Sequence, residues 1–577
     1  MLTRLMSFRC AMFRLVLLLP LLCSTFLLKS LGDASRPERV EAKNGVVATD
    51  ETACSRIGRD LLKQGGHAVD AAVGATLCIG VVSPAESGLG GGGFILVRQA
   101  DGQAKVYDMR EIAPGRASKD MFANMTELEW KVNPLSIAVP GQLAGLYTVQ
   151  QKYGKLPWAS VVKPCEDLAR NAFKISRALS RKIASVGPHI LSDESFGSVF
   201  APNGQILVEG QTLRLRKLAD TLAAIGKHGM GIFYNGSIAD GLVKDIRKRK
   251  GIVTKEDFQK YRVITREPLV SSVLGYNLLT VPPPASGGAV VILILKTLSK
   301  FDNNVTTSLF VHRTIEALKY ALALRMNLGD PGFVNITNIV NYMTADSTAQ
   351  KIKNLIDDKK TFDPVHYGSR WSQVDDHGTN HLCIIDRERN VVTMTTSINT
   401  RFGSKIMSES TGIFFNNQMY DFSIPTSKGK PGAPANYVSP YKRPLSSLEP
   451  IILLKGGCVR AVIGSAGGLL IPDSVSQTLL NFFVRKKHIF TSVKTPRFYH
   501  RLYPNVLLHE NYSSVNSDHY VYTDKTLSDL KKRGHHLRQA TAMMTTCQFV
   551  VQTLIGNKTG LLTAVSDLRK GGFPAGY

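Results

Sequence analysis

The sequence predicts an α/β sandwich, a fold in which helices cover β-sheets. Helical patterns span residues 54–80 and most of residues 140–350, and from Thr379 onward the pattern changes to strand. Helices before and after β-hairpins favour sheets with helical layers on them. The chain has 577 residues, of which 44% are hydrophobic, enough for a large folded core. The hairpin patterns pair residues 94–97 with 105–109, 381–385 with 391–398, and 451–454 with 460–463.

The first half of the chain shows these elements in order. Residues 54–80 indicate two alanine-rich helices broken by the double glycine at 65–66. A strand from Phe94 follows four consecutive glycines, and its partner strand ends just before Arg110. Within the helical region, residues 282–288 are rich in proline and glycine, and we interpret them as a plain turn.

The N-terminus resembles a targeting segment. Three arginines precede an apolar stretch from Leu15 to Leu28, which is shorter than the ~20 residues that span a bilayer and suits a signal-peptide core. We therefore expect residues 1–30 to be a signal peptide or a signal anchor, and residues 31–42 to be a polar stalk. Cleavage and retention of the segment remain open. The arginines are Arg4, Arg9 and Arg14.

Glycosylation triplets and cysteines fit a secreted or surface protein. Two of the eight cysteines lie in the leader, and the others form no CxxC or Cys/His cluster, so the sequence predicts no metal site and no cofactor. Asn-x-Ser/Thr triplets often arise by chance, and here they only add weight to an extracellular context. The six acceptors are Asn124, Asn235, Asn304, Asn335, Asn511 and Asn557.

The formal net charge of +26 raises the question of a polyanionic partner. The basic runs are short and scattered, at residues 247–250, 485–488 and 531–533. No zinc-finger spacing, basic zipper or RNA-binding aromatic pair accompanies them. We therefore interpret them as solvated faces and expect no nucleic-acid partner.

The dipeptide Gly378-Thr379 indicates how a weak nucleophile could be activated. A threonine hydroxyl needs a base, and a threonine at a chain start can use its own α-amine. A glycine before it removes side-chain crowding from the bond that must break. The dipeptide is common by chance, so its value depends on the motifs around it.

Those motifs occur in order along the chain. The segment from Thr379 to Asp421 resembles the start of the small subunit of the gamma-glutamyltransferase family, also called glutathione hydrolases. The resemblance extends from about residue 40 to the end, and residues 566–577 are similar to the C-terminus of animal members. Further matching motifs lie at residues 65–72, 88–94, 110–114, 443–447 and 464–468.

This resemblance implies the four-layer αββα fold of N-terminal nucleophile hydrolases, with Thr379 beginning a central strand. Autocleavage after Gly378 would give a large subunit, residues 43–378, and a small catalytic subunit, residues 379–577, which form one intertwined heterodimer. The resemblance also implies a disulfide between Cys54 and Cys78. Animal members commonly keep the N-terminal segment as an anchor, so we expect a type II single-pass cell-surface protein or a secreted one.

The implied chemistry is acyl transfer through a γ-glutamyl ester of Thr379. Glutathione, its conjugates and other γ-glutamyl compounds would donate the acyl group, and water, amino acids or dipeptides would accept it. Ser397 stands where the family usually has a threonine that hydrogen-bonds the nucleophile. Gly467 and Gly468 correspond to the pair whose N–H groups stabilise the oxyanion.

The family's substrate-binding positions are also occupied. Arg110 would bind the α-carboxylate of the glutamyl group, because guanidinium groups pair with carboxylates in bidentate geometry. Gln418 replaces a glutamate common in animal members, which removes one negative charge and predicts weaker attraction for the ammonium. The other residues implied are Ser446 and Ser447 for the carboxylate, and Asn399 and Asp421, with Gln418, for the ammonium.

Two alternatives remain open at this stage. A related acylase could use Thr379 on a different acyl group, although Arg110 together with Asp421 argues for an amino-acid-like head group. An inactive, unprocessed homologue could instead bind polyanions through its positive charge. Intact Thr379 and Asn399 argue against that second alternative.

Overall fold

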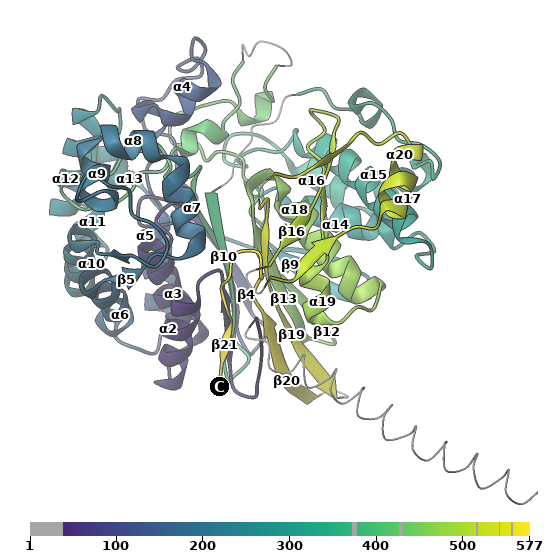
Figure 1. Ribbon diagram of the computed structural model, residues 1–577, viewed down its shortest axis with the longest axis horizontal. Helices are drawn as coiled ribbons and strands as arrows, with labels where there is room; N and C mark the ends of the chain where they lie inside the picture. The colour runs from purple at the N-terminus through teal and green to yellow at the C-terminus, as the bar shows by residue number, and fades with distance from the viewer. Residues whose placement is uncertain (1–37, 372–377, 426–430, 515–516, 542, 556–557) are drawn as a thin grey trace, which may run out of the picture.

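Two stacked antiparallel β-sheets form the centre of the molecule, with helices on both outer faces (Figure 1). The computed structural model describes residues 38–371, 378–425, 431–514, 517–541, 543–555 and 558–577. The first sheet has the strand order β21 (Ala575–Gly576), β2 (Val46–Thr49), β10 (Gly378–Ile385), β11 (Val391–Asn399), β3 (Gly92–Arg98), β4 (Ala104–Asp108) and β7 (Ile264–Arg266). The second has the order β1 (Arg39–Ala42), β20 (Lys558–Val565), β19 (Thr546–Ile555), β13 (Cys458–Ala466), β12 (Ile451–Lys455), β9 (Tyr276–Thr280) and β8 (Leu269–Val273).

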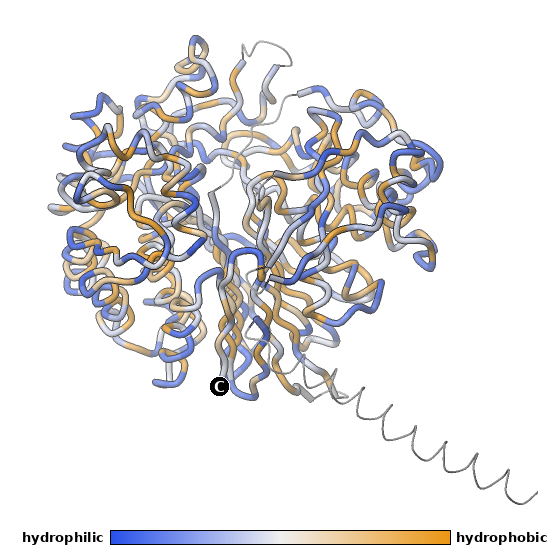
Figure 2. The backbone as a smooth tube through the Cα atoms, in the orientation of Figure 1, coloured by the Kyte–Doolittle hydropathy of each residue, from blue (hydrophilic) through white to orange (hydrophobic). Residues whose placement is uncertain are grey.

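Alternating side chains along the strands create the four layers. On β10, Leu382 and Ile384 pack against the helices over the first sheet, whereas Cys383 and Ile385 pack between the two sheets. Val462 of β13 enters the same core between the sheets. Hydrophobic stretches accordingly follow the stacked strands at the centre (Figure 2). The expected αββα fold is confirmed.

The outer layers consist of helices that contact the sheets or one another. The first sheet is covered by α2 (Thr52–Lys63), α3 (Ala68–Val82), α5 (Gln142–Tyr153), α6 (Trp158–Asn171) and α10 (Arg216–His228). The second is covered by α14 (Gly287–Leu298), α15 (Thr307–Arg325), α18 (Ile471–Leu479) and α19 (Ile489–Lys494).

Shorter elements complete the described chain. The remaining α-helices are α4 (Glu127–Val132), α7 (Arg177–Ser185), α8 (Gly187–Ser192), α9 (Glu194–Phe200), α11 (Gly231–Tyr234), α12 (Ser237–Lys248), α13 (Lys255–Lys260), α16 (Thr337–Thr344), α17 (Asp346–Leu355) and α20 (Asp524–Lys532). Single turns are η1 (Pro134–Ser136), η2 (Pro364–Tyr367), η3 (Gln418–Asp421), η4 (Pro434–Asn436) and η5 (Gly468–Leu470), and η6 (Leu480–Val484) is a π-helical turn. Small sheets pair β5 (Phe173–Lys174) with β6 (Thr212–Leu213), β16 (Asn511–Ser513) with β17 (His519–Val521), and β15 (Leu507–His509) with β14 (Phe498–Tyr499) and β18 (Leu537–Gln539).

The three predicted hairpins are confirmed, and two other segments differ from expectation. Strands β7, β8 and β9 interrupt the region that the sequence predicts to be mainly helical, and they supply edges of both sheets. Residues 39–42 belong to the predicted stalk, yet they form β1 and pair with β20. An edge strand leaves part of its surface in water, so its polar residues resemble those of a linker.

The disulfide Cys54–Cys78 is formed and joins α2 to α3, as the family resemblance implies.

Four glycosylation acceptors are exposed, Asn511 is half-buried on β16, and Asn557 lies outside the described residues. No helix within the described ranges is both long and apolar enough to cross a membrane, and the N-terminal segment 1–30 lies outside those ranges. The exposed acceptors are Asn124, Asn235, Asn304 and Asn335.

Candidate active site

Strand β10 places Thr379 inside the sandwich and at the start of an interior strand. Thr379 pairs with Ser397 of β11, and β2 lies on the other side of β10. Side chains alternate along a strand, so Thr379 faces the second sheet, as Cys383 does. Only 4% of Thr379 is exposed. The predicted central-strand position of Thr379 is therefore confirmed.

Close packing across the strands explains the glycine before Thr379. Gly378 pairs with Asn399, and a β-bulge separates this pair from the next one. A Cβ atom at Gly378 would lie 2.2 Å from the backbone oxygen of Asn399. A larger residue would therefore displace β11 next to the predicted cleavage bond.

The hydroxyl of Ser397 contacts the carbonyl of that bond. It donates a hydrogen bond to the Gly378 oxygen at 2.5 Å and accepts one from the Asn399 N–H at 2.8 Å. The resemblance leads us to expect a hydrogen bond to the nucleophile, whereas the uncut chain has this bond to the carbonyl. A donor at this oxygen stabilises the negative charge that nucleophilic attack would create there.

Gly467 and Thr379 line one cavity of about 170 Å³. Gly467 follows β13 with a φ of 137°, and a Cβ atom there would lie 2.6 Å from the Met544 oxygen. Glycine meets both the backbone and the space requirements at this turn. Gly468, with a φ of 59°, begins η5 directly after it.

Charged side chains missed by the sequence analysis surround this cavity. Glu86 forms ion pairs with Lys182, at 2.6 Å, and with Lys570, at 2.5 Å. Burial alone would raise the pKa of Glu86, but these two lysines outweigh it and lower the pKa to about 2. Lys570 also pairs with Asp50 and donates to the Asn380 side chain.

Two signals could have suggested these residues. Glu86 lies just before the glycine-rich motif at residues 88–94, and Lys570 lies within the C-terminal motif. Neither position follows a hydrophobic period or a metal-ligand spacing, so single-sequence reasoning gave them no role. Only the fold brings the two segments together beside Thr379.

Arg110 and Asp421 meet in a second, buried part of the site. Arg110 is 1% exposed and forms an ion pair with Asp421. It also donates to the backbone oxygens of Pro444 and Leu445, each at 3.3 Å. Gln418 donates to Asp421 at 2.8 Å. The predicted carboxylate-binding and ammonium-binding groups are therefore in contact with each other.

The side-chain amides of Asn399 and Gln418 have buried oxygens that lack a donor among the described residues. The Asn399 amide nitrogen donates to the Asn417 oxygen at 3.0 Å, which directs the other end of the amide away from that contact. Buried acceptors are nearly always hydrogen-bonded, so this pair suits a ligand that brings N–H donors.

Ser446 and Ser447 lie immediately after the segment that Arg110 contacts. The Ser447 hydroxyl accepts a hydrogen bond from Arg325 at 2.9 Å, and the Ser446 hydroxyl accepts one from the Leu448 N–H at 3.2 Å. Each hydroxyl can still donate its own hydrogen.

The loop at residues 282–288, interpreted from the sequence as a plain turn, supports this pair of serines. Ser286 donates to the Ser446 backbone oxygen through both its N–H, at 2.7 Å, and its hydroxyl, at 2.6 Å. Arg325 donates to the Ser286 hydroxyl at 2.8 Å. Residues 283–284 do form a turn, and the loop has an additional structural part that the sequence interpretation lacked, because Ser286 holds the segment that carries the two serines.

One group of potential metal ligands occurs within the described ranges, formed by His312, Glu316 and His535. The two imidazoles hydrogen-bond to each other at 2.8 Å, and His312 also contacts the Asp357 oxygen. Glu316 accepts hydrogen bonds from neighbouring side chains. These contacts explain the cluster as a buried hydrogen-bond network.

Comparison with known proteins identifies this arrangement. The Gamma-glutamyltranspeptidase family model matches residues 54–577. The chain belongs to the gamma-glutamyltranspeptidase family. It is 46% identical over 550 residues to Glutathione hydrolase 2 of Arabidopsis thaliana, covering 94% of this chain and 95% of the relative. It is 38% identical over 557 residues to Glutathione hydrolase proenzyme 1 of Schizosaccharomyces pombe, covering 93% and 85%.

A solved structure shares the fold of this chain. Cephalosporin acylase from Bacillus halodurans superposes with a TM-score of 0.81 over 94% of this chain and 97% of that one, at 24% identity. The relatives support the family but not the animal branch expected from the C-terminus, because two Arabidopsis thaliana proteins are 46% and 43% identical to this chain, whereas a protein of the centipede Scolopendra dehaani is 36% identical. A C-terminal motif of twelve residues therefore did not distinguish between branches of this family.

In this gamma-glutamyltranspeptidase, the predicted site residues form a nearly continuous set. Thr379, Ser397 and Asn399 follow each other through the β10–β11 register, and Gln418 connects to Arg110 through Asp421. Gly467 reaches the Thr379 cavity from the second sheet. Ser446 and Ser447 join the set through the segment that Arg110 contacts.

Proposed function

We propose that this chain cuts itself between Gly378 and Thr379, and that the new N-terminal threonine then cleaves the γ-glutamyl bond of glutathione and similar compounds. The observation that carries this proposal is the Ser397 hydroxyl on the Gly378 carbonyl, next to a buried Thr379. This arrangement places a polarised carbonyl, that of Gly378, directly before the proposed nucleophile, the hydroxyl of Thr379. The names of the relatives, glutathione hydrolase and its proenzyme, agree with this activity.

Self-cleavage would begin with attack of the Thr379 hydroxyl oxygen on the Gly378 carbonyl carbon. The C–N bond breaks, an ester forms between Gly378 and the Thr379 oxygen, and the Thr379 amine is released. Water then hydrolyses the ester, leaving a Gly378 carboxylate and the free hydroxyl. Ser397 would stabilise the oxyanion of the first step through its existing hydrogen bond.

Catalysis would use the amine that self-cleavage creates. An α-amine has a pKa of ~8, so it can accept the hydroxyl proton near neutral pH. The Thr379 oxygen attacks the γ-carbonyl of the donor, the donor's amine leaves with a proton, and a γ-glutamyl ester remains. Water or an acceptor amine resolves that ester in a ping-pong sequence. N–H groups of Gly467 and Gly468 would stabilise the oxyanion of both steps.

The buried ion pair would open to recognise the glutamyl head group. The α-carboxylate would replace Asp421 on Arg110, with added donors from Ser446 and Ser447. The α-ammonium would then pair with Asp421 and donate to the vacant acceptors of Asn399 and Gln418. This exchange keeps every buried charge paired, which is the condition for burying charges at modest cost.

The two pieces would remain associated after cleavage. The large-subunit strands β2 and β3 flank the small-subunit strands β10 and β11 in the first sheet. Separation would therefore break a central sheet. We also propose entry into the secretory pathway through residues 1–30, with the mature protein at the cell surface as a type II protein or secreted. Acceptor amino acids or dipeptides belong to the same proposal.

A denaturing gel and a chromogenic γ-glutamyl anilide test these proposals together. The natural chain should give two pieces and release the aniline, with faster release in the presence of glycylglycine as acceptor. A single full-length band from active material would contradict the threonine mechanism. Two pieces without γ-glutamyl turnover would contradict the substrate assignment alone.

A further inference from the structure

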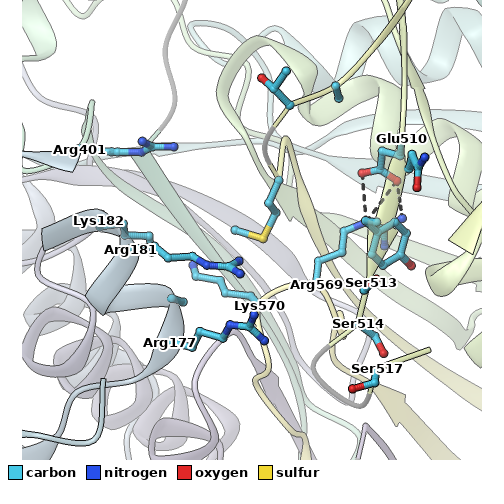
Figure 3. Close-up of a pocket in the computed structure, with 16 residues that line it drawn as sticks. Arg177, Arg181, Lys182, Arg401, Glu510, Ser513, Ser514, Ser517, Arg569 and Lys570 are labelled. Atoms are coloured by element: carbon cyan, nitrogen blue, oxygen red, sulfur yellow. Dashed lines mark hydrogen bonds and ion pairs between the residues drawn. The ribbon is translucent and has the colours of Figure 1, made fainter. Parts of the chain in front are cut away.

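A larger cavity adjoins the one that contains Thr379. Its volume is about 670 Å³, within the range of small-molecule sites. Lys182, Arg401, Met543 and Lys570 line both cavities, so the two are continuous. The larger one, which we name the basic cavity, lies between α7 and the strands near β16 (Figure 3).

The lining of the basic cavity is strongly positive. Its only carboxylate among the described lining residues is Glu510, which pairs with Arg569 at 2.6 Å. A concave surface lined by one sign of charge concentrates its field in the cavity and attracts counter-ions. The six cationic residues of the lining are Arg177, Arg181, Lys182, Arg401, Arg569 and Lys570.

Three of these cations have no carboxylate partner in the described chain. Lys182 and Lys570 pair with Glu86, and Arg569 pairs with Glu510, but no described carboxylate lies within 4.0 Å of Arg177, Arg181 or Arg401. These three arginines are exposed to solvent. Their positive charges lack a carboxylate partner in the described chain, so an anion in the cavity could pair with them.

The fold brings the three arginines to the same opening. Arg177 and Arg181 are four residues apart on α7, which places them on one helix face. Figure 3 shows both extending from α7 toward the cavity, near Lys182 and Lys570. Arg401 follows β11, two residues after Asn399, and so connects this opening to the catalytic strands.

The position of the basic cavity relative to Thr379 suggests its ligand. Under the proposed function, on which this inference rests, the glutamyl head group lies on the side of Arg110 and Asp421. Neither of those residues lines the basic cavity or the Thr379 cavity. The amine half of the donor, and later the acceptor amine, must therefore extend away from that side.

We propose that the basic cavity binds this amine half and selects amines that carry more than one carboxylate. One carboxylate can pair with the lysines next to Thr379, and a second can reach the arginines at the opening. Donors of this class are γ-glutamyl peptides with an acidic residue after the γ-glutamyl bond, and glutathione conjugates with an acidic sulfur substituent. Because the three arginines are exposed, water and salt keep the preference moderate, at about tenfold.

Two dipeptides of nearly equal shape test the proposal. The leaving amine of γ-glutamyl-glutamate carries two carboxylates, and that of γ-glutamyl-glutamine carries one carboxylate and a neutral amide. At low salt, kcat/KM should be about tenfold higher for γ-glutamyl-glutamate. The ratio should approach one in 0.5 M NaCl, and also in the variant with Arg177→Gln, Arg181→Gln and Arg401→Gln.

The control variant is Arg216→Gln. Arg216 is an exposed arginine on α10 that lines neither cavity. Its substitution removes one positive charge, as each substitution in the triple variant does, but it should keep the tenfold ratio. The charge-matched comparison is the single variant Arg181→Gln, which also loses one positive charge. A decrease of the ratio in the Arg216→Gln control as large as that in Arg181→Gln would assign the effect to net charge and overturn the proposal.

Other outcomes separate this inference from the proposed function. Normal turnover of the anilide by the natural enzyme, with a dipeptide ratio near one or a ratio that salt does not change, would overturn the inference only. Absence of turnover for the anilide and both dipeptides would contradict the proposed function itself. A triple variant that keeps the tenfold ratio would likewise show that these arginines do not select the substrate.

Discussion

The charged side chains on the two sides of Thr379 differ in burial and in pairing. On the head-group side, Arg110 and Asp421 are buried and paired with each other. On the amine side, Arg177, Arg181 and Arg401 are exposed and have no carboxylate partner in the described chain. A buried pair recognises one fixed arrangement of charges, because each unmatched charge is costly. Exposed cations act through a screened field and tolerate ligands of many shapes.

This difference matches what the proposed reaction requires on each side. Every donor shares the same glutamyl head group, whereas leaving amines and acceptors vary. Strict recognition on one side and loose attraction on the other would combine a constant acyl group with varied amines. Thr379 is the boundary between the two sides. Substitutions at this boundary, on the head-group side and on the amine side should therefore have effects of different size.

The largest effect is expected at the boundary itself. Thr379→Ala removes the hydroxyl that is proposed to attack both the Gly378 carbonyl and the γ-carbonyl of the donor. The variant should therefore stay uncut and give one full-length band on a denaturing gel. Turnover of any γ-glutamyl substrate should decrease by a factor on the order of 10⁶, the scale for loss of a catalytic nucleophile. Mass spectrometry of the band and the anilide assay measure these outcomes. Two pieces from this variant would exclude cleavage by Thr379.

The next largest effect is expected on the head-group side. Arg110→Gln leaves Asp421 buried without its arginine and should raise KM for the anilide about a hundredfold, with a smaller change in kcat. The melting temperature should also decrease. In the double variant Arg110→Gln/Asp421→Asn, the melting temperature should recover in part, because residue 421 no longer carries an unpaired charge although Glu111 still lacks Arg110, while KM remains high.

That pair of variants separates recognition from stability. Recovery of both quantities in the double variant would mean that the ion pair is structural and does not bind the head group. An unchanged KM in the single variant would remove Arg110 from the proposed site.

Self-cleavage should respond to Ser397 with an intermediate effect. Ser397→Ala removes the donor to the Gly378 carbonyl and should slow the appearance of the two pieces about a hundredfold, the usual scale for one oxyanion donor. Ser397→Thr keeps the hydroxyl and should cleave at close to the natural rate. A time course on denaturing gels measures both variants. Equal rates for alanine and threonine would exclude a role for the hydroxyl.

The smallest effect is expected from pH on the amine side. Burial lowers the pKa of Lys182 to about 8, against the attraction of Glu86. Burial also raises the pKa of Glu51, the residue directly before α2, to about 7, against the attraction of Lys570 and Lys182. As pH rises from 6 to 9, Glu51 gains a negative charge and Lys182 loses its positive charge. Both changes reduce the positive potential near Thr379, so the dipeptide ratio should decrease severalfold.

The neighbouring charges do not reverse this sign. Glu86 stays ionised because its pKa is about 2, and the acidic groups around Lys570 raise its pKa despite its burial, so it stays protonated. The dipeptide ratio cancels the titration of the Thr379 amine, which acts on both substrates equally. Lys182→Met should reduce the pH dependence, and a ratio that rises with pH would contradict the assignment.

The sequence by itself predicted the layered α/β fold and named the residues that are proposed to bind the head group. Strand patterns at residues 381–385 and 391–398, on either side of a polar turn, predicted the central hairpin of β10 and β11. The motif residues Thr379, Arg110 and Asp421 were found because short motifs keep their spacing in the chain. Local patterns of this kind can be recognised in the amino-acid sequence alone.

Only the tertiary structure decided which distant residues meet. Lys182 lies 96 residues after Glu86, and Lys570 lies 388 residues after Lys182, yet the three form one ion-paired group beside Thr379. The residues of β1 resemble a linker in the sequence, and only the structure shows that they pair with β20. Such contacts arise from strand order and packing between layers, and neither leaves a periodic signal in the sequence. The unpaired arginines of the basic cavity belong to the same class, because the absence of a partner is a property of three-dimensional space.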